Sequence, residues 1–386
     1  MEKSGWIFST FLAVQVLTSF SQNTTGWKSI DCGINRIRSD GILRWDVDSD
    51  YTQTGFNRLV QKETTRAEFN TLRIFPNKTQ DNCYIVPAET QSIRYIIRAG
   101  FYYGNYDGLS SPPTFNLFIN DAIWTTINTA ENNGEPFYKE IMIESNGSGV
   151  FKICLVQIKG GGVPFINSIE VVVLWDKMYS QMESNATYNL INRTNFGGEE
   201  IRFDPIKKDE MYNRIWSKGV TPSTCANVID YTDDTSTFEN YPPYLVLMSS
   251  IESSDLDSIF LTIDLPDYPQ SAYFVFYITE LVYRLPSETR TINIQIAGQD
   301  QGTVEAPAIG ESIVITKYPV RVSGPVVSVI LTRSEGSRLP PMLAAMEVLT
   351  KQDTNVNYTT QLSAAAREYI SLAYSLIIPF ILLLVA

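Results

Sequence analysis

The stretch "YIIRAGFYYGNYDGLSSPPTFNLFI", from Tyr95 to Ile119, contains two apolar segments separated by a turn. In the second segment Phe115, Leu117 and Ile119 occupy every second position and so lie on one face, a period-two pattern typical of half-buried β-strands. The turn "YGNYDG" supplies glycine, asparagine and aspartate, which tight turns favour. The stretch therefore predicts two strands joined by a turn, and this turn carries more aromatic side chains than a turn requires.

The same alternation recurs along the chain, for example in "SIFLTIDL" (Ser258–Leu265) and "TINIQI" (Thr291–Ile296). Between the two ends of the chain, no long segment shows the 3.6-residue period of an amphipathic helix. Many short strands separated by turn residues predict an all-β fold of the β-sandwich, jelly-roll-like type.

The chain also repeats its pattern at a fixed offset. When it is shifted by 177 positions, "PFINSIEV" (Pro164–Val171) falls on "PMLAAMEV" (Pro341–Val348). With the same shift, "RYIIRAGFYY" (Arg94–Tyr103) falls on "SAYFVFYITE" (Ser271–Glu280). Internal similarity of this kind indicates two copies of one structural plan.

We therefore predict two homologous β-sandwich domains, at residues 26–178 and 186–350, with residues 179–185 as the linker. The sequence around the join reads "SQMESNATYNLINRTN", which is polar and contains two glycosylation sequons. Such a composition predicts an exposed connecting segment.

Residues 1–21 have the features of a secretory signal peptide rather than of a buried helix. Lys3 precedes an apolar run from Trp6 to Leu17, and the small residues Ser19 and Ser21 fit a cleavage site. We therefore expect a secreted glycoprotein, in which N-x-[ST] sequons mark surface loops. The six sequons begin at Asn23, Asn77, Asn146, Asn185, Asn192 and Asn357.

The C-terminal end combines a polar spacer, residues 351–368, with an apolar tail, residues 369–386. The tail is at the short end of the roughly 17–25 residues that span a membrane as a helix, and it contains Pro379. The small residues that begin at Ser363 instead fit the attachment site of a glycolipid anchor, whose tail is removed. Both interpretations remain open, and both place the protein at the extracellular face of the plasma membrane.

The composition excludes several classes of function. The chain has no histidine, so it has no Ser-His-Asp or Cys-His catalytic pair and no zinc site with imidazole ligands. The net charge of −12 argues against a nucleic-acid-binding surface. A glycosidase needs only two carboxylates, but no spacing among the 42 acidic residues singles out a pair. We therefore expect no enzymatic activity, no catalytic residue and no cofactor.

Three further motifs are interpreted as structural. "DVDSD" (Asp46–Asp50) lacks the glycine and the distal glutamate of an EF-hand loop, so we expect a turn or strand end and no metal site. "IKGGGVPF" (Ile158–Phe165) lacks the Lys-Ser/Thr of a phosphate-binding loop. In "DEMYNRIW" (Asp209–Trp216) we expect Trp216 to be buried and Arg214 to pair with a carboxylate.

The four cysteines lie far apart, which excludes a CxxC metal or redox motif. In an oxidising compartment they can form disulfides, and two of them can equally be buried thiols. Three pairings are possible among Cys32, Cys83, Cys154 and Cys225, and the sequence does not choose between them.

Four motifs together resemble the plant malectin-like ectodomain, the outer part of many plant receptor-like kinases with leucine-rich repeats. They are "DCG" (Asp31–Gly33), the stretch Tyr95–Ile119, the segment Pro164–Val171 and "NFGGEEIRFDPIKKDEMYNRIW" (Asn195–Trp216). This resemblance, over about residues 27–350, implies two tandem malectin-type β-sandwiches and extracellular, non-catalytic recognition. The sequence lacks leucine-rich repeats and a kinase, so we expect a receptor-like ectodomain without kinase.

The aromatic turn is the candidate ligand site. Aromatic faces stack on the C–H face of a sugar, and amide or carboxylate groups take its hydroxyls. In animal malectin, aromatic side chains at the end of the corresponding strand line the sugar site, and this resemblance points to the first two tyrosines of the turn. The candidate ligand-binding residues are Tyr102, Tyr103, Asn105, Tyr106 and Asp107.

Two alternatives remain open at this stage. The turn can have a purely structural role, because alternation along a strand sends one of Tyr102 and Tyr103 inward. The site can also lie in the cleft between the domains, where pockets often form. We predict a carbohydrate or cell-wall-polymer ligand, or alternatively a peptide-binding or co-receptor module that associates with a full receptor kinase.

Overall fold

The computed structural model describes residues 27–40, 43–78, 81–174, 178–203, 210–230, 239–254, 258–283, 285 and 287–352. Within these residues the secondary structure is almost entirely β, with 25 strands, one four-residue α-helix and three 3-10 turns, which confirms the predicted all-β class. No helix in this part of the chain is long and apolar enough to cross a membrane. The predicted signal peptide, the apolar tail, Asn23, Asn357 and Ser363 lie outside the described residues.

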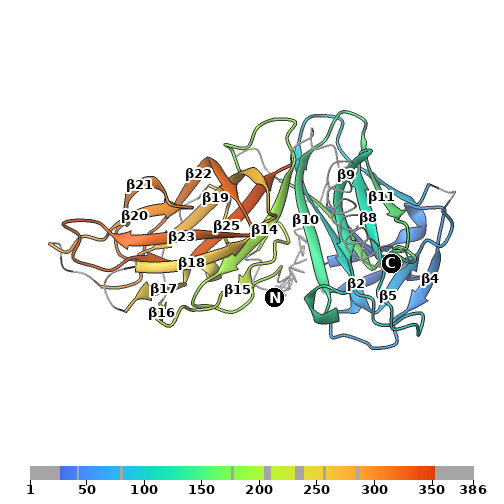
Figure 1. Cartoon of the computed structure of the whole chain (residues 1–386), viewed down its shortest axis with the longest axis horizontal. Helices are drawn as coiled ribbons and strands as arrows, with labels where there is room; N and C mark the ends of the chain where they lie inside the picture. The colour runs from blue at the N-terminus through green and yellow to red at the C-terminus, as the bar shows by residue number, and fades with distance from the viewer. Residues whose placement is uncertain are drawn as a thin grey trace, which may run out of the picture.

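The first half of the molecule is a β-sandwich, seen on the right of Figure 1. One layer has the order β2 (Arg38–Asp40), β3 (Leu43–Val47), β1 (Lys28–Asp31), β13 (Ser168–Val173), β7 (Arg94–Phe101) and β10 (Phe137–Glu144). The second layer has the order β6 (Cys83–Pro87), β11 (Val150–Gln157), β8 (Thr114–Ile119) and β9 (Ala122–Asn128). A small sheet contains β12 (Phe165–Ile166), β5 (Thr71–Ile74) and β4 (Phe56–Leu59), and 3-10 turns lie at η1 (Asp48–Asp50), η2 (Ala67–Phe69) and η3 (Asn132–Gly134).

The second half repeats this arrangement. Its main layer has the order β14 (Tyr188–Asn195), β25 (Ala345–Lys351), β19 (Pro269–Thr279) and β22 (Ser312–Ser323), with β15 (Ser217–Lys218) beside β14. Its four-stranded layer has the order β18 (Ser258–Asp264), β23 (Val326–Arg333), β20 (Thr291–Ile296) and β21 (Gln299–Glu305). Its small sheet contains β16 (Cys225–Ile229), β17 (Ser249–Ser253) and β24 (Met342–Leu343), and α1 spans Tyr244–Leu247.

Strands at equivalent sheet positions follow the offset found in the sequence. β8 begins at Thr114 and β20 at Thr291, which is 177 positions later. β12 and β24 begin at Phe165 and Met342, again 177 positions apart. The chain therefore forms two sandwiches of one plan, while the exact limits proposed for the domains remain a prediction.

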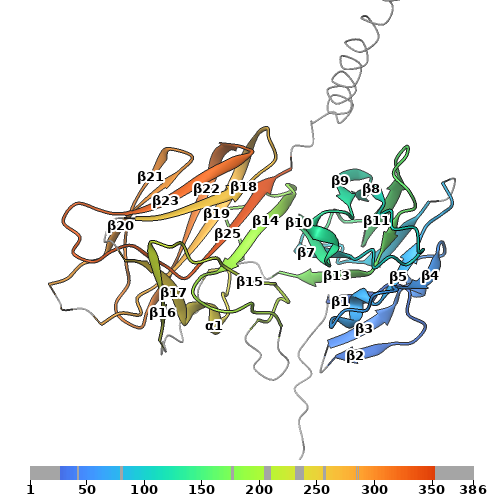
Figure 2. The ribbon, with the colours of Figure 1, turned by 60° about the horizontal axis from the view of Figure 1, so that its bottom comes forward.

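The two sandwiches share one continuous sheet. β10, the last strand of the first main layer, pairs antiparallel with β14, so that Ile141 lies opposite Asn189 and Met142 opposite Tyr188. The pairing joins the two main layers into a sheet of 11 strands, and Figure 2 shows β10 and β14 adjacent at its centre. A sheet that crosses from one half to the other fixes their relative position through backbone hydrogen bonds.

Each half has its own apolar core, and a third core lies at the junction. Strand β19 contributes to two of them, because Phe274 and Phe276 face the second core whereas Tyr273 and Tyr277 face the junction core. Successive side chains of a strand point to opposite faces, so this strand is buried on both sides. The predicted half-buried pattern instead holds for β8, β18 and β20.

The join between the halves is exposed at Ser180, Gln181 and residues 183–185, as the sequence predicts, but buried apolar side chains anchor it to the molecule. Tyr179 and Tyr188 are fully buried and Met182 is 5% exposed, and all three belong to the junction core. These few apolar residues pack in the junction core against residues of the continuous sheet.

Cys83 and Cys154 form a disulfide. Two of the three pairings that the sequence allowed are therefore excluded. The two cysteines are directly opposite on the neighbouring strands β6 and β11, with their Cα atoms 4.0 Å apart. Cys32 is a fully buried thiol at the end of β1.

Candidate functional site

The aromatic turn, residues 101–108, packs onto the first core. Tyr102 and Tyr103 are 4% and 8% exposed. The hydroxyl of Tyr102 donates to the carbonyl of Lys62 at 3.0 Å, and the hydroxyl of Tyr103 donates to the carboxylate of Asp107. Burial and this carboxylate raise the pKa of Tyr103, so its hydroxyl remains a donor at neutral pH. Both tyrosines therefore pack into the first core, whereas alternation along a strand predicts that only one of them points inward.

The rest of the turn is held by its own polar groups. The Asn105 side chain donates to Gln61 at 3.1 Å and accepts from the N–H of Ser110 at 2.9 Å. The ring of Tyr106 is half-buried against Phe165, with 5.5 Å between ring centroids. The structure thus brings the five predicted residues into one turn, and a ligand can reach only its partly exposed members: Asn105, Tyr106 and Asp107.

A buried row of alternating charges crosses the junction between the halves, and we name it the charge ladder. Its five members come from five adjacent strands of the continuous sheet, β13, β7, β10, β14 and β25. Each member is at most 6% exposed. In spatial order they are Glu170, Arg98, Glu140, Arg193 and Glu347.

Short ion pairs connect every neighbouring pair of the ladder. Arg98 lies 2.9 Å from Glu170 and 2.8 Å from Glu140. Arg193 lies 2.9 Å from Glu140 and 2.7 Å from Glu347, so it joins the first half to the second. A buried charge is strongly destabilising unless it is paired, and alternation of sign gives each member of the ladder a partner of opposite charge.

The pKa shifts in the ladder follow from the number of cations beside each carboxylate. Burial by itself raises the pKa of Glu140, but Arg193 and Arg98 on either side outweigh burial and lower it. Among the described residues, Glu170 at the end of the ladder forms an ion pair with Arg98 alone, and burial raises its pKa. The central carboxylate is therefore held firmly ionised.

In the segment predicted to be structural, residues 210–216 close the second end of the ladder. Trp216 and Arg214 are fully buried, and Arg214 pairs with Glu210 at 3.2 Å, as predicted. The Arg214 guanidinium also donates to the hydroxyl of Tyr179, which in turn donates to Glu347 at 2.9 Å. This chain of contacts ties the join between the halves to the last carboxylate of the ladder.

Sequence reasoning missed the ladder, although a signal was present. Arg98, Glu170 and Glu347 each interrupt an otherwise apolar strand. Glu170 and Glu347 are also separated by the repeat offset of 177 and fall on each other in the matched segments. A charged residue at the same place in two copies of an apolar strand indicates a required buried partner.

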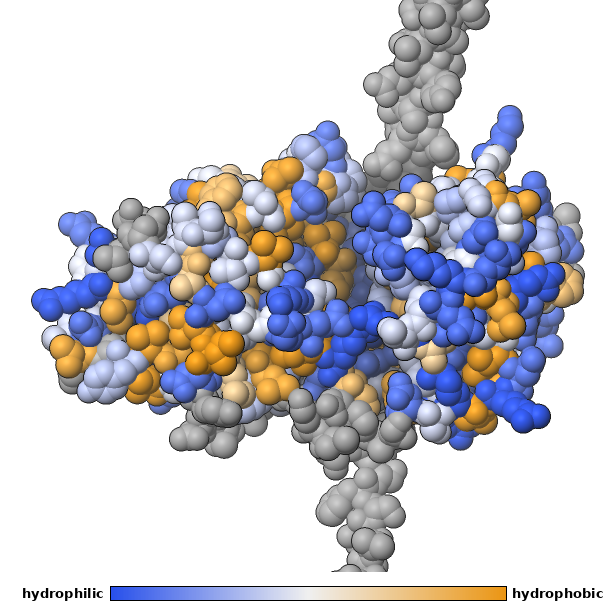
Figure 3. Space-filling model, turned by 90° about the horizontal axis from the view of Figure 1, so that it is seen from below, coloured by the Kyte–Doolittle hydropathy of each residue, from blue (hydrophilic) through white to orange (hydrophobic). Residues whose placement is uncertain are grey.

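A cleft of about 570 Å³ lies between the two halves, above the charge ladder. Strands β9 and β10 of the first half form one wall, and β14, the end of β25 and the loop at residues 266–268 form the other. Glu140 of the ladder is among the lining residues. Figure 3 shows the hollow between the halves from below.

The side chains of the cleft are chemically mixed. Thr126 is exposed at the rim, Tyr268 is 38% exposed, and Leu190 is half-buried. Lys139 pairs with Glu131 at 3.6 Å outside the cleft, so its charge is only partly compensated at this distance. The arrangement can receive a ligand that carries apolar groups, hydrogen-bonding groups and charge together.

The acidic motif Asp46–Asp50 contains a structural ion pair. Asp48 is fully buried and accepts two hydrogen bonds from Arg73, at 2.6 and 2.7 Å, and one from the hydroxyl of Tyr84 at 3.1 Å. Among the described residues, no group of three or more cysteine, aspartate or glutamate side chains is arranged to hold a metal ion.

The predicted glycosylation sites differ in their surroundings. Asn77, Asn146 and Asn185 are exposed, whereas Asn192 is half-buried within β14. The side-chain oxygen of Asn192 accepts a hydrogen bond from Thr194 at 2.6 Å. The expectation of a surface loop is therefore wrong for Asn192, and glycan attachment at the exposed sites remains a prediction.

Comparison with known proteins gives a consistent result. The family model of the malectin-like domain matches residues 30–351. The chain is 30% identical over 372 residues to "Probable LRR receptor-like serine/threonine-protein kinase At1g07550" of Arabidopsis thaliana, covering 92% of this chain and 41% of that protein. It is 27% identical over 360 residues to "Leucine-rich repeat receptor-like serine/threonine-protein kinase At2g14510" of the same plant, covering 87% and 40%. The chain thus spans about two-fifths of these relatives.

Solved structures share the fold at low sequence identity. The ANXUR2 extracellular domain from Arabidopsis thaliana aligns with a TM-score of 0.71 and 15% identity, over 85% of this chain and 97% of that one. A chain in the crystal structure of plant peptide RALF23 in complex with FER and LLG2 aligns with a TM-score of 0.70 and 13% identity, over 86% and 96%. The chain therefore shares the fold of these receptor ectodomains. With its two joined sandwiches and the family match over most of its length, the chain belongs to the malectin-like domain family.

Proposed function

We propose that this protein is an extracellular, non-catalytic recognition module that binds a polypeptide ligand in the cleft between its two halves. The observation that carries this proposal is the cleft itself, which both halves line and whose floor includes a residue of the charge ladder. A site built from two bodies that share one sheet is preorganised, so binding costs little ordering of the protein.

The chemistry of the cleft favours a polypeptide over a neutral polymer. Apolar groups, threonine hydroxyls, an asparagine and charges of both signs line it, which suits the mixed side chains of a peptide. The structural neighbour crystallised as plant peptide RALF23 in complex with FER and LLG2 supports the same class of ligand. A receptor kinase or co-receptor is the partner that such a module would serve.

Carbohydrate binding at the aromatic turn is the second candidate function. It is favoured by the surface position of Tyr106, Asn105 and Asp107, whose side chains offer a ring face and polar groups to a sugar. Tyr102 and Tyr103 support this site from the core rather than by direct contact. Secretion, N-glycans and attachment to the membrane through the C-terminal tail complete the proposal.

The experiment is a binding screen on the full chain secreted from eukaryotic cells. A displayed library of random peptides and a glycan array serve as the two probes. We expect selected peptides to lose at least about tenfold in affinity with Tyr268→Ala or Thr126→Arg, since each alters the cleft. Tyr283→Ala and Thr262→Arg are matched controls, because Tyr283 is 77% exposed and Thr262 is exposed on β18, and neither lines the cleft.

Two outcomes would contradict the peptide proposal. One is that selected peptides bind the cleft variants and the controls equally well. The other is that only glycans bind, and that Tyr106→Ala removes this binding while the cleft variants do not. The second outcome would move the site to the aromatic turn.

A further inference from the structure

A second cavity, of about 380 Å³, lies on the outer face of the four-stranded sheet of the first half. It is separate from the cleft, with which it shares no lining residue. Its volume is within the range of roughly 300–1,000 Å³ that is usual for ligand pockets. Residues that decide its chemistry are Lys78, Asn82, Phe118, Asp121, Val156 and Gln157.

The floor of this cavity is apolar. Cys154 on β11 lies directly opposite Cys83 on one side and Phe118 on the other, so that the disulfide and the phenylalanine form one row across the sheet. Val156 lies two residues further along β11, hence on the same face, and is 44% exposed. An apolar surface of this kind is suited to the C–H face of a sugar ring.

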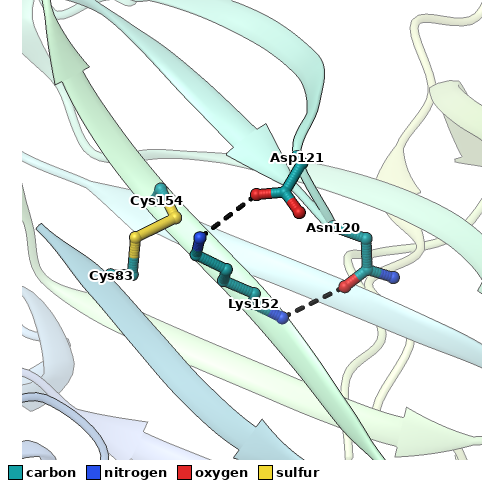
Figure 4. The surroundings of a disulfide bond; sticks show 5 residues. All are labelled: Cys83, Asn120, Asp121, Lys152 and Cys154. Atoms are coloured by element: carbon teal, nitrogen blue, oxygen red, sulfur yellow. Dashed lines mark hydrogen bonds and ion pairs between the residues drawn. A yellow bond between two sulfur atoms is a disulfide. The ribbon is translucent and has the colours of Figure 1, made fainter. Parts of the chain in front are cut away.

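The walls of the cavity are polar. The Lys152 ammonium and the Asp121 carboxylate form a pair at 3.1 Å beside the disulfide, as Figure 4 shows. Ring hydroxyls and N-acetyl groups of a ligand can hydrogen-bond to this ammonium and this carboxylate.

A glycosylation sequon lies at the edge of this cavity. Asn77 is exposed, and its carbonyl accepts a hydrogen bond of 2.9 Å from the side chain of Asn82, a lining residue. Lys78, the next residue in the chain, also lines the cavity. A glycan on Asn77 would therefore begin within reach of the apolar floor.

We propose that this cavity is a saccharide site and that the glycan attached to Asn77 occupies it, with its first N-acetylglucosamine rings on the row formed by the disulfide and Phe118. The ring hydroxyls and N-acetyl groups face Asp121 and Lys152. The glycan thereby covers apolar surface of the first half. This inference does not depend on the ligand of the cleft.

The first test compares two glycans on one native protein. The full chain, secreted with short N-glycans, is treated with an endoglycosidase that cuts between the two core N-acetylglucosamines, and mass spectrometry follows each site. We expect the glycan on Asn77 to be released at least about fivefold more slowly than that on exposed Asn146, because release first requires it to leave the cavity. Val156→Glu should remove this protection. Ile85→Glu should not, since Ile85 is 45% exposed on the same sheet but does not line the cavity.

The second test uses Asn77→Gln, which has no glycan at this site, with free di-N-acetylchitobiose as the probe and chemical-shift changes as the readout. We expect saturable binding that Val156→Glu abolishes and Ile85→Glu retains. Binding of the free probe together with unprotected release from Asn77 would contradict the assignment of the glycan as occupant. Equal release from Asn77 and Asn146, with no binding of the probe, would overturn the saccharide site altogether.

Discussion

Asp31 in the first half and Asn195 in the second occupy the same place, yet one carries a charge and the other does not. Both end the first strand of their main layer, and both are at most 1% exposed. Thr71 donates a hydrogen bond to Asp31 at 2.9 Å, and Ser249 donates the equivalent bond to Asn195 at 3.1 Å. The fold thus requires a buried acceptor here, but not an ionised one.

Both halves also require a glycine two residues after this position. Gly33 and Gly197 both have a positive φ, +90° and +76°. A Cβ at either residue would lie 2.4 Å from a carbonyl oxygen, of Leu72 in one half and of Ser250 in the other. Such a separation is too short for any side chain, so glycine is a requirement of the shared plan.

The outer faces of the two four-stranded sheets differ more. Where Cys83 and Cys154 form the disulfide between β6 and β11, the second half has Phe260 opposite Ile330 between β18 and β23. An apolar cross-strand pair therefore replaces the covalent bond. The positions that are alike in the two halves, such as the glycines, are required by the shared fold. The positions that differ, such as the disulfide, are particular to one half.

The largest effect should come from the feature that joins the halves. Arg193→Ala leaves Glu140 and Glu347 buried with one cation fewer, and we expect a loss of about 3–5 kcal/mol in the free energy of unfolding. Urea denaturation followed by tryptophan fluorescence measures it. Arg202→Ala, at a partly exposed pair with Glu200, should cost less than about 1 kcal/mol. A similar small loss for both variants would show that the ladder does not hold the halves together.

Removing the disulfide should have the next largest effect. Cys83→Ala with Cys154→Ala opens a loop between residues 71 positions apart, and we expect a loss of about 2–4 kcal/mol. Phe260→Ala should cost about 1 kcal/mol, because the side chain is already 51% exposed. Thermal melting of the variants compares the two faces directly. An equal loss would mean that the covalent bond adds nothing beyond an apolar pair.

The contribution of Asp31 to stability should depend on pH, whereas that of its neutral counterpart Asn195 should not. Burial is the largest influence on Asp31 and raises its pKa from 3.8 to about 6, although Arg38 lowers it. The folded state then binds the proton more tightly than the unfolded state, so the contribution of Asp31 to stability increases as pH falls from about 6 to about 4. The change is on the order of 2 kcal/mol.

Asp31→Asn makes the first half like the second and should remove this dependence. The measurement is the free energy of unfolding of the original protein and of the variant between pH 4 and pH 7. If the difference between the two proteins does not vary with pH, Asp31 does not titrate in this range.

The smallest effect should come from Tyr106 in the aromatic turn, a turn that has no counterpart in the second half. Tyr106 is only half-buried, and Tyr106→Ala should cost about 1 kcal/mol, whereas Tyr102→Ala should cost about 3 kcal/mol because the ring belongs to the first core. Differential scanning calorimetry measures both. Equal melting temperatures for the two variants would place Tyr102 outside the core.

Much of the fold could be predicted from the chain because the signals are local. Alternation identified strands such as β18 and β20, and the offset of 177 identified two copies of one plan. The burial of Trp216 and the pairing of Arg214 were likewise predictable from an aromatic and a cation in one short segment. Alternation predicted that only one of Tyr102 and Tyr103 points inward, but both are in the core, because β7 ends at Phe101 and alternation does not extend beyond the end of a strand.

The all-β class, the repeat and the exclusion of histidine chemistry follow from the amino-acid sequence, since these depend on composition and on neighbours along the chain. The pairing of the cysteines depends instead on the three-dimensional arrangement of the strands, as do the contacts of Arg98 with Glu140 and of Arg193 with Glu347, partners 42 and 154 positions apart. Strand order in a sheet sets such contacts, and no local pattern encodes that order. The cleft and the charge ladder exist because β10 and β14 pair at the junction, a single long-range choice that turns two sandwiches into one molecule.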